Sequence, residues 1–235
     1  MRDELGASRV FVFDHNVRNA TRPGMPMPSR QVHNDHTVNS APRRVRDHLG
    51  ADAEELLKHR FGIVNLWRPI RGPVEDSPLA LCNARSFTDD DLIASDLVYA
   101  HVRGETSRVA YNPAHRWYYF SEMQTDEVLF IRVHHSANDG RARLSFHTSF
   151  DNPAGSRRTA AGEHRGAHAC ILLAGCLKVL STGRLAPSAF GARRRLVAPV
   201  QLDAAPRLYE ASSATEVRLY VDGDFLSIRS AVALA

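Results

Sequence analysis

The chain of 235 residues is long enough for one domain with a buried core, and 43% hydrophobic with 24% charged residues is typical of a soluble globular protein. A net charge of +4 and a pI of about 9.2 are mild, and the clustered arginines lack interleaved aromatic residues, so we expect no nucleic-acid partner. Three cysteines without a Cys-x-x-Cys pair, no apolar leader and no apolar run of about 18 residues predict a cytoplasmic protein that has no structural zinc and does not enter a membrane.

The N-terminal part of the chain predicts a strand, a loop and a helix in that order. Residues 9–13, Arg-Val-Phe-Val-Phe, are typical of a short buried strand, and a core strand so near the first residue indicates a sequence that has been cut into. Prolines mark residues 19–29 as a loop. Residues 41–60 predict a helix whose apolar stripe is interrupted at Gly50.

From residue 61 onward the pattern is that of short β-strands separated by turns. The predicted strands are residues 61–70, 79–84, 117–120, 126–134 and 141–150, while residues 92–102 fit a strand or a short helix. The sequence shows neither a Gly-rich phosphate loop nor a regular alternation of strands with helices. It therefore predicts a mainly β protein with flanking helices, built as an antiparallel sandwich or barrel.

The composition shifts after Pro153, where Ala, Arg, Leu, Ser and Gly dominate and regular periods are hard to find. Residues 169–180 form an apolar run, and residues 217–228 fit a hairpin around Asp222-Gly223. Pattern alone does not connect this tail to any chemistry.

The most informative stretch is residues 32–37, Val-His-Asn-Asp-His-Thr, which places His33 and Asp35 two residues apart. Side chains at positions i and i+2 of a strand point to the same face. One imidazole and one carboxylate are two of the three ligands of a 2-His-1-carboxylate iron site, and His147 is the best candidate for the third. The alternatives are a surface hydrogen bond between His33 and Asp35, which chance allows among twelve histidines, and a core position for His147.

Other polar and aromatic residues are weaker candidates. Arg68 and Arg116 could bind a substrate carboxylate or form ion pairs at strand edges, and Trp117 could contact substrate or belong to the core. His134 and His135 are adjacent on a predicted strand and face opposite ways, so at most one of them could reach a metal bound by the trio.

Seven short stretches together carry a family resemblance. They are Val-Phe-Val-Phe-Asp-His-Asn-Val-Arg at 10–18, Val-His-Asn-Asp-His-Thr at 32–37, Asn-Leu-Trp-Arg-Pro-Ile at 65–70, Pro-Leu-Ala-Leu-Cys-Asn-Ala-Arg-Ser at 78–86, His-Arg-Trp-Tyr-Tyr-Phe at 115–120, Asp-Glu-Val-Leu at 126–129 and Phe-His-Thr-Ser-Phe at 146–150. In this order and spacing they resemble the hydroxylase/desaturase family of fungal and bacterial secondary metabolism. That family includes the AsaB-type oxidoreductases, gibberellin desaturase and the hydroxylase component of cephamycin 7-alpha-methoxylation.

The resemblance implies an iron(II)- and 2-oxoglutarate-dependent oxygenase on a double-stranded β-helix, or jelly roll. It implies that His33, Asp35 and His147 hold the iron, that 2-oxoglutarate and dioxygen are cosubstrates, and that a small secondary metabolite is hydroxylated or desaturated. Two other functions stay open, a catalytically inactive fragment of such an enzyme and a metal-dependent hydrolase that uses the same ligands.

The sequence departs from the family pattern in three places. A region that usually precedes the first strand is missing, and His134-His135-Ser136 stands where the family has Tyr-Asp-Ser. The family motif Pro-Arg-Glu-Ser-Ile-Glu-Val-Arg, expected after the distal histidine, is absent as well. If that motif carries the basic residue that anchors 2-oxoglutarate, Arg143 is a possible substitute.

The missing motif fits a shifted reading frame. Residues 159–169, Thr-Ala-Ala-Gly-Glu-His-Arg-Gly-Ala-His-Ala, can be encoded by codons that give Pro-Pro-Arg-Glu-Ser-Ile-Glu-Val-Arg-Thr one base further on. We hypothesise a frameshift between about Asn152 and Thr159. Residues 1–153 are then a partial double-stranded β-helix domain, and residues 154–235 are a divergent tail without native structure. We accordingly expect the last core strands to be absent and a sheet edge to be left unpaired.

Overall fold

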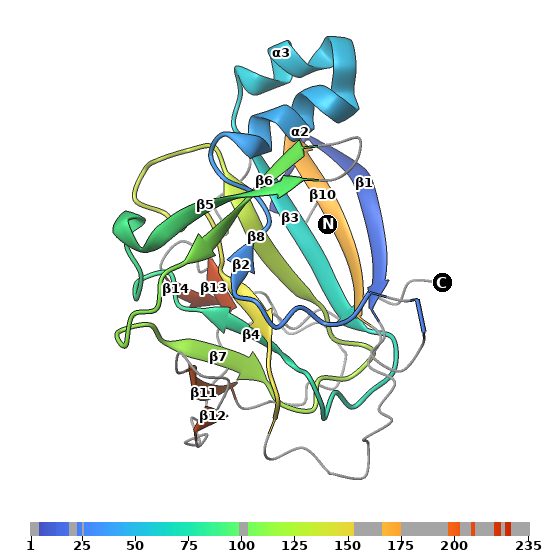
Figure 1. Ribbon diagram of the computed structural model, residues 1–235. Coiled ribbons are helices and arrows are strands. Elements are labelled where there is room, and N and C mark those ends of the chain that lie inside the picture. The colour runs from blue at the N-terminus through green and yellow to red at the C-terminus, as the bar shows by residue number, and fades with distance from the viewer. Residues whose placement is uncertain are drawn as a thin grey trace.

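The structure is a computed structural model that describes residues 5–18, 23–24, 26–98 and 103–152, together with strands at 166–174, 197–202, 208–209, 219–221 and 224–226. Antiparallel strands in two main sheets make up most of the described chain, and helices lie at one end of the sheets (Figure 1). The predicted fold class, mainly β with flanking helices, is therefore confirmed.

The first sheet has four strands in the order β1-β10-β3-β8. These are β1 (Arg9–Arg18), β10 (Gly166–Ala174), β3 (Phe61–Pro69) and β8 (Leu129–His135). Strand β10 comes from the tail and pairs with both β1 and β3, so the expectation of an unpaired edge at this place is wrong. Regular backbone pairing needs only an extended chain of sufficient apolar character, which the predicted apolar run supplies. The proposed domain boundary at residue 153 stays a prediction.

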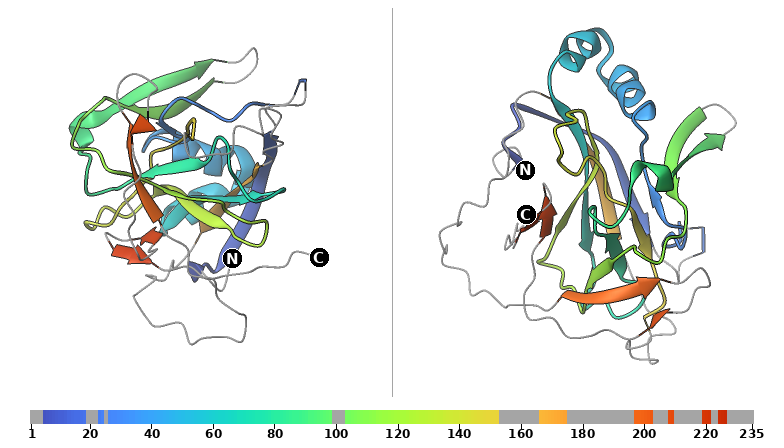
Figure 2. Two further views of the ribbon diagram at one scale, coloured as in Figure 1. Left: turned by 90° about the horizontal axis from the view of Figure 1, so that it is seen from below. Right: turned by 90° about the vertical axis from the view of Figure 1, so that its left-hand side faces the viewer.

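The second sheet has eight strands in the order β12-β11-β7-β4-β9-β2-β6-β5. These are β2 (His33–Asn34), β4 (Leu79–Cys82), β5 (Leu92–Val98), β6 (Arg103–Val109), β7 (Trp117–Phe120), β9 (His147–Ser149), β11 (Val197–Leu202) and β12 (Leu208–Tyr209). A short 3-10 turn, η2 (Asp89–Asp91), precedes β5, which is a strand and not a helix. Strands β5 and β6 form a hairpin that projects from the body (Figure 2).

Helical structure follows β2 as predicted, but it is divided into shorter segments where the sequence predicts one helix over residues 41–60. Helix α2 (Ser40–Leu49) ends at Gly50, whose φ of 49° is a left-handed conformation that glycine adopts without strain. The chain continues through η1 (Gly50–Asp52) into α3 (Ala53–Leu57). Ala41 and Val45 of α2 are buried in the same core cluster as Phe61 and Ile63 of β3, which fixes the helices on the end of the sheet.

The tail hairpin is the remaining described element. Strands β13 (Leu219–Val221) and β14 (Asp224–Leu226) pair antiparallel on either side of the predicted Asp-Gly turn. The predicted strand at residues 141–150 is shorter than expected, because only β9 (His147–Ser149) pairs in the described chain.

Strand β3 is the central packing element of the four-stranded sheet, and its two faces have different neighbours. Ile63 and Trp67 belong to the main core cluster together with Ile131 and Val133 of β8. Val64 and Leu66 point the other way, where they pack with Ala7, Leu5, Val10 and Phe130. Side chains alternate along a strand, so Asn65 and Pro69 share the face of Ile63 and Trp67. This face carries the residues of β3 that line the site described next.

Candidate metal centre

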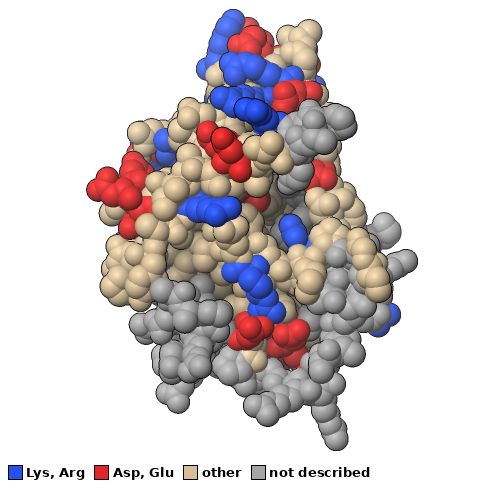
Figure 3. All heavy atoms as spheres, viewed as in Figure 1, with Lys and Arg blue, Asp and Glu red and all other residues tan. Residues whose placement is uncertain are grey.

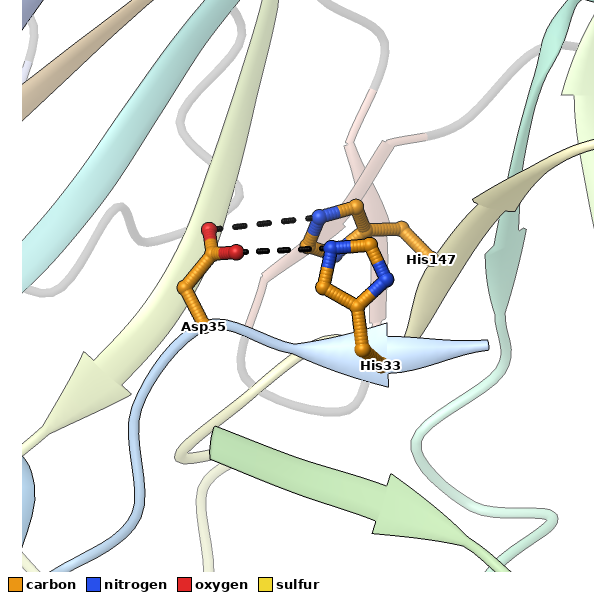
Figure 4. A group of neighbouring side chains, drawn as sticks. All are labelled: His33, Asp35 and His147. Atoms are coloured by element: carbon orange, nitrogen blue, oxygen red, sulfur yellow. Dashed lines mark ion pairs between the residues drawn. The ribbon is translucent and has the colours of Figure 1, made fainter. Parts of the chain in front are cut away.

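His33, Asp35 and His147 converge at the centre of the eight-stranded sheet (Figure 4). His33 of β2 lies directly opposite His147 of β9 in an antiparallel pair, so both imidazoles stand on one face with ring centroids 4.6 Å apart. Asp35 follows β2 two residues after His33 and returns to that face. A local spacing and one long-range strand pairing thus assemble the trio that the sequence predicts.

The distances between the donor atoms of the trio are slightly longer than those expected around a bound metal ion. The donor atoms all lie within 4.8 Å of one another, with His33 Nε2 3.4 Å from Asp35 Oδ1 and His147 Nε2 4.0 Å from Asp35 Oδ2. Ligand atoms about 2.1 Å from a metal and at right angles to one another lie about 3 Å apart. Shifts of roughly an ångström therefore bring all three atoms to coordination distance.

The backbone fixes which nitrogen of each histidine faces the carboxylate. His33 Nδ1 lies 2.7 Å from the carbonyl oxygen of Gln31, and His147 Nδ1 lies 3.0 Å from that of Ser145. A carbonyl only accepts hydrogen bonds, so each Nδ1 carries the proton and each Nε2 presents a lone pair when the ring is neutral. Two lone pairs and a carboxylate then point at one another, and a bound cation satisfies all three.

Asn65 of β3 orients the carboxylate from the opposite sheet. Its Nδ2 donates a short hydrogen bond to Asp35 Oδ2, and the residue is only 1% exposed. Within the described chain Asn65 Oδ1 has no hydrogen-bond partner. The sequence signal for this role is a lone amide within the apolar run Phe-Gly-Ile-Val-Asn-Leu-Trp at residues 61–67.

Electrostatics in the trio favour an ionised carboxylate beside one neutral imidazole. Burial raises the pKa of Asp35, but the hydrogen bond from His33 and the charge of His147 hold it well below its ordinary value. Burial lowers the pKa of His33, whereas Asp35 raises it by hydrogen bond and charge, so the net shift is upward. Burial, only partly offset by Asp35, lowers the pKa of His147. The site is negatively charged when both rings are neutral, which suits a divalent cation.

A pocket of about 630 Å³, open solvent included, adjoins the trio. Its wall combines apolar side chains with hydroxyl groups and one arginine, and its lining residues are Arg18, Pro28, Ser29, His33, Asp35, Trp67, Pro69, Val74, Ser77, Leu79, His147, Thr148 and Ser149. A concave pocket whose wall is mostly apolar and carries a few polar groups is typical of a small-molecule site. The candidate metal centre therefore opens onto a pocket with the lining of an organic-ligand site.

The structure does not bring the other predicted site residues to this pocket. Arg68 lies on the face of β3 opposite Trp67, and Arg116 is exposed just before β7. Trp117 is 3% exposed in a second core cluster with Phe146. Arg143 Nε donates to the carbonyl oxygen of His135, 3.1 Å away. Their substrate and cosubstrate roles remain predictions that the pocket geometry does not support.

Sequence reasoning identified only the trio among the lining residues, and two of the residues it missed show why. Trp67 lies in a predicted strand with nothing to mark it as a site residue, and it is both a core residue and part of the pocket wall. Arg18 lies at the end of a strand whose sequence gives no sign of where its last residue points. His134 and His135 are buried and do not line the pocket.

Figure 3 shows the charged side chains on one face of the molecule. Basic side chains gather over the helical end at the top with acidic ones among them, and other basic and acidic side chains are scattered below. Among the described helices, none is both long and apolar enough to cross a membrane.

The fold and the site together define a class, an antiparallel β protein in which two histidines and one carboxylate that could hold a metal ion lie beside a pocket. Comparison with known proteins identifies the family to which the chain belongs. The model of the family described as oxidoreductase/YMDC permease-like domain matches residues 1–165, and the chain belongs to this family.

Two curated relatives and one solved structure that are similar to this chain all carry the names of oxidising enzymes. The hydroxylase/desaturase efuI of Hormonema carpetanum is 37% identical over 177 residues, covering 64% of this chain and 60% of that protein. The hydroxylase/desaturase asaB of Aspergillus flavus is 39% identical over 127 residues, covering 46% of this chain and 54% of that protein. The iron and alpha-ketoglutarate-dependent endoperoxidase NvfI has a similar structure, with a TM-score of 0.69 and 28% identity over 74% of this chain and 65% of that one.

These comparisons confirm the resemblance found in the sequence, because both curated relatives are named hydroxylase/desaturase and the solved structure is named an iron and alpha-ketoglutarate-dependent endoperoxidase. The chain spans less than two thirds of the length of each relative described above.

Proposed function

We propose that this chain is a non-haem iron(II)- and 2-oxoglutarate-dependent oxidoreductase that hydroxylates or desaturates a small secondary metabolite with dioxygen. The observation that carries the proposal is the convergence of His33 Nε2, His147 Nε2 and the Asp35 carboxylate, with both Nδ1 atoms engaged by backbone carbonyls. The names of the relatives identify the chemistry with which such a ligand set is used in this family.

The side chains present fit iron(II). His33, Asp35 and His147 would hold it on one face and leave other coordination positions open. When bound, iron with 2-oxoglutarate and dioxygen supplies the oxidising power toward a C–H bond that protein side chains lack.

The remaining chemistry belongs to the residues of this chain. The carbonyl oxygens of Gln31 and Ser145 hold the rings in the tautomer that presents Nε2. Asn65 fixes Asp35 Oδ2, so the carboxylate does not rotate away from the histidines. These contacts preorganise the ligand set before a metal enters, which limits the reorganisation needed on binding.

The pocket wall sets the class of substrate. Trp67, Pro69, Val74 and Leu79 form an apolar surface that excludes water next to the metal ligands. The hydroxyl-bearing residue Ser77 adds a group able to hydrogen-bond an oxygen-rich molecule. We therefore propose a compact, mostly apolar metabolite with a few oxygen functions, and a cytoplasmic site of action in keeping with the cysteine content.

The test is anaerobic loading with Fe(II), followed by exposure to dioxygen with 2-oxoglutarate and measurement of succinate. We expect one iron per chain and succinate formation that His147→Ala abolishes, with Arg116→Gln as a surface control that changes neither. Iron binding without succinate would favour the inactive-fragment alternative, and hydrolytic activity without dioxygen would favour a hydrolase.

A further inference from the structure

The proposed function requires a positively charged side chain in the pocket, in addition to the residues that would hold the metal. 2-Oxoglutarate chelates a metal through its 2-oxo acid end and carries a second carboxylate at the other end. Burying that carboxylate in an apolar pocket is costly unless a charged donor pairs with it. The described residues of the pocket wall include one such donor, Arg18.

Strand pairing places the Arg18 side chain on the site face of the four-stranded sheet. Arg18 of β1 is opposite Gly166 of β10, and Gly166 is opposite Pro69 of β3. Residues opposite one another across antiparallel strands share a face. Pro69 in turn shares the face of Trp67 and Asn65, so Arg18 stands in the row of residues that lines the pocket.

The guanidinium of Arg18 is held at the pocket and still has donors to spare. Its Nη1 donates to the carbonyl oxygen of Met27, 2.8 Å away, which restrains the side chain. Within the described chain this is its one recorded polar contact, so it has no carboxylate partner there. A guanidinium has five N–H donors in a planar fork, which leaves an edge free for a bidentate pair with a carboxylate.

The competing groups near the pocket are already engaged. Arg30, which reaches Ser77 Oγ at 2.9 Å, is paired with Asp151 at 2.7 Å. The hydroxyls of Thr148 and Ser149 donate to the carbonyl oxygen of Ser29, at 3.2 Å and 2.7 Å. Arg18 is therefore the pocket group with both a free positive charge and free donors among the described residues.

We propose that Arg18, and not Arg143, is the positioning residue that binds the distal carboxylate of 2-oxoglutarate. The charges balance, because a divalent metal and Arg18 neutralise Asp35 and the cosubstrate dianion together. The assignment rests on the proposed function of the same site. It makes the pocket selective for a 2-oxo acid that carries a second carboxylate.

The test compares two 2-oxo acids that share the chelating end. The full chain is loaded with Co(II), and 2-oxoglutarate or 2-oxobutyrate is titrated by calorimetry and by the fluorescence of Trp67 at the pocket wall. We expect the wild type to bind 2-oxoglutarate about 10- to 100-fold more tightly, since a charge-assisted bidentate pair is of that strength. Arg18→Gln should remove this preference by weakening 2-oxoglutarate alone, and Arg18→Lys should restore part of it.

Two control variants and the binding of 2-oxobutyrate distinguish a specific role of Arg18 from a general loss of folding. Arg143→Gln, the rival assignment, should leave the preference unchanged, and so should Arg68→Gln on the opposite face of β3. Retained 2-oxobutyrate and Co(II) binding in Arg18→Gln shows that the site is folded. A preference that survives in Arg18→Gln, or disappears in Arg143→Gln, overturns the assignment while the proposed function stands. If neither acid binds the metal-loaded wild type, both proposals fail.

Discussion

Replacing Asn65 by leucine tests whether the opposite sheet preorganises the metal ligands. Asn65 is 1% exposed and its amide holds Asp35 Oδ2, so Asn65→Leu removes a hydrogen bond to an ionised group, worth about 1.5–3 kcal/mol. The same substitution also removes the buried Oδ1, which has no partner in the described chain and whose burial costs about 1–3 kcal/mol. The two effects oppose each other, so we expect the metal-free protein to lose little stability.

Metal affinity should respond differently from stability. Without Asn65 the Asp35 carboxylate is free to rotate, and loss of such a supporting contact lowers metal affinity by about 10- to 100-fold. The assay is a Co(II) or Fe(II) titration of the wild type and Asn65→Leu, with urea unfolding of the metal-free forms beside it. Asn112→Leu is the matched control, because Asn112 Nδ2 makes a similar bond to Asp91 Oδ1 at 3.3 Å, away from the trio. Unchanged metal affinity in Asn65→Leu would refute the reasoning.

Three further predictions use other features of the chain. Iron(II) at 100 times its dissociation constant should stabilise the wild type by about 2.7 kcal/mol in thermal unfolding, and His33→Ala should show no such gain. Burial lowers the pKa of His134 to about 3 and that of His135 to about 4, so the unfolded state binds more protons as the pH falls below about 6.5. The contribution of these two neutral histidines to the free energy of unfolding is therefore present above that pH and is lost toward pH 4. His134→Phe keeps a ring against Phe61, and it should reduce the loss of unfolding free energy measured with urea between pH 7 and pH 5. Finally, the coding DNA should read Pro-Arg-Glu-Ser-Ile-Glu-Val-Arg one base out of frame at residues 159–169; codons that cannot give this motif would end the frameshift hypothesis.

Several outcomes show how local the successful sequence inferences were. The helical character after residue 40, the β-character from residue 61 and the tail hairpin each depend on neighbouring residues, and the structure contains all three. The pairing of β10 between β1 and β3 was not predicted, because strand order depends on contacts between distant segments. Arg68 shows the same limit, since its face is decided by which side of β3 meets the core.

The sequence by itself determined the residue types of the trio and half of their geometry, because the two-residue spacing of His33 and Asp35 predicts that their side chains point the same way. Only the tertiary structure decided that His147 stands opposite His33, that Asn65 reaches Asp35 from the other sheet, and that Arg18 faces the pocket in place of Arg143. The physical reason is strand register. A shift of one residue turns every side chain of a strand to its other face, and the register between distant strands is set by the burial of both sheets and not by any local pattern.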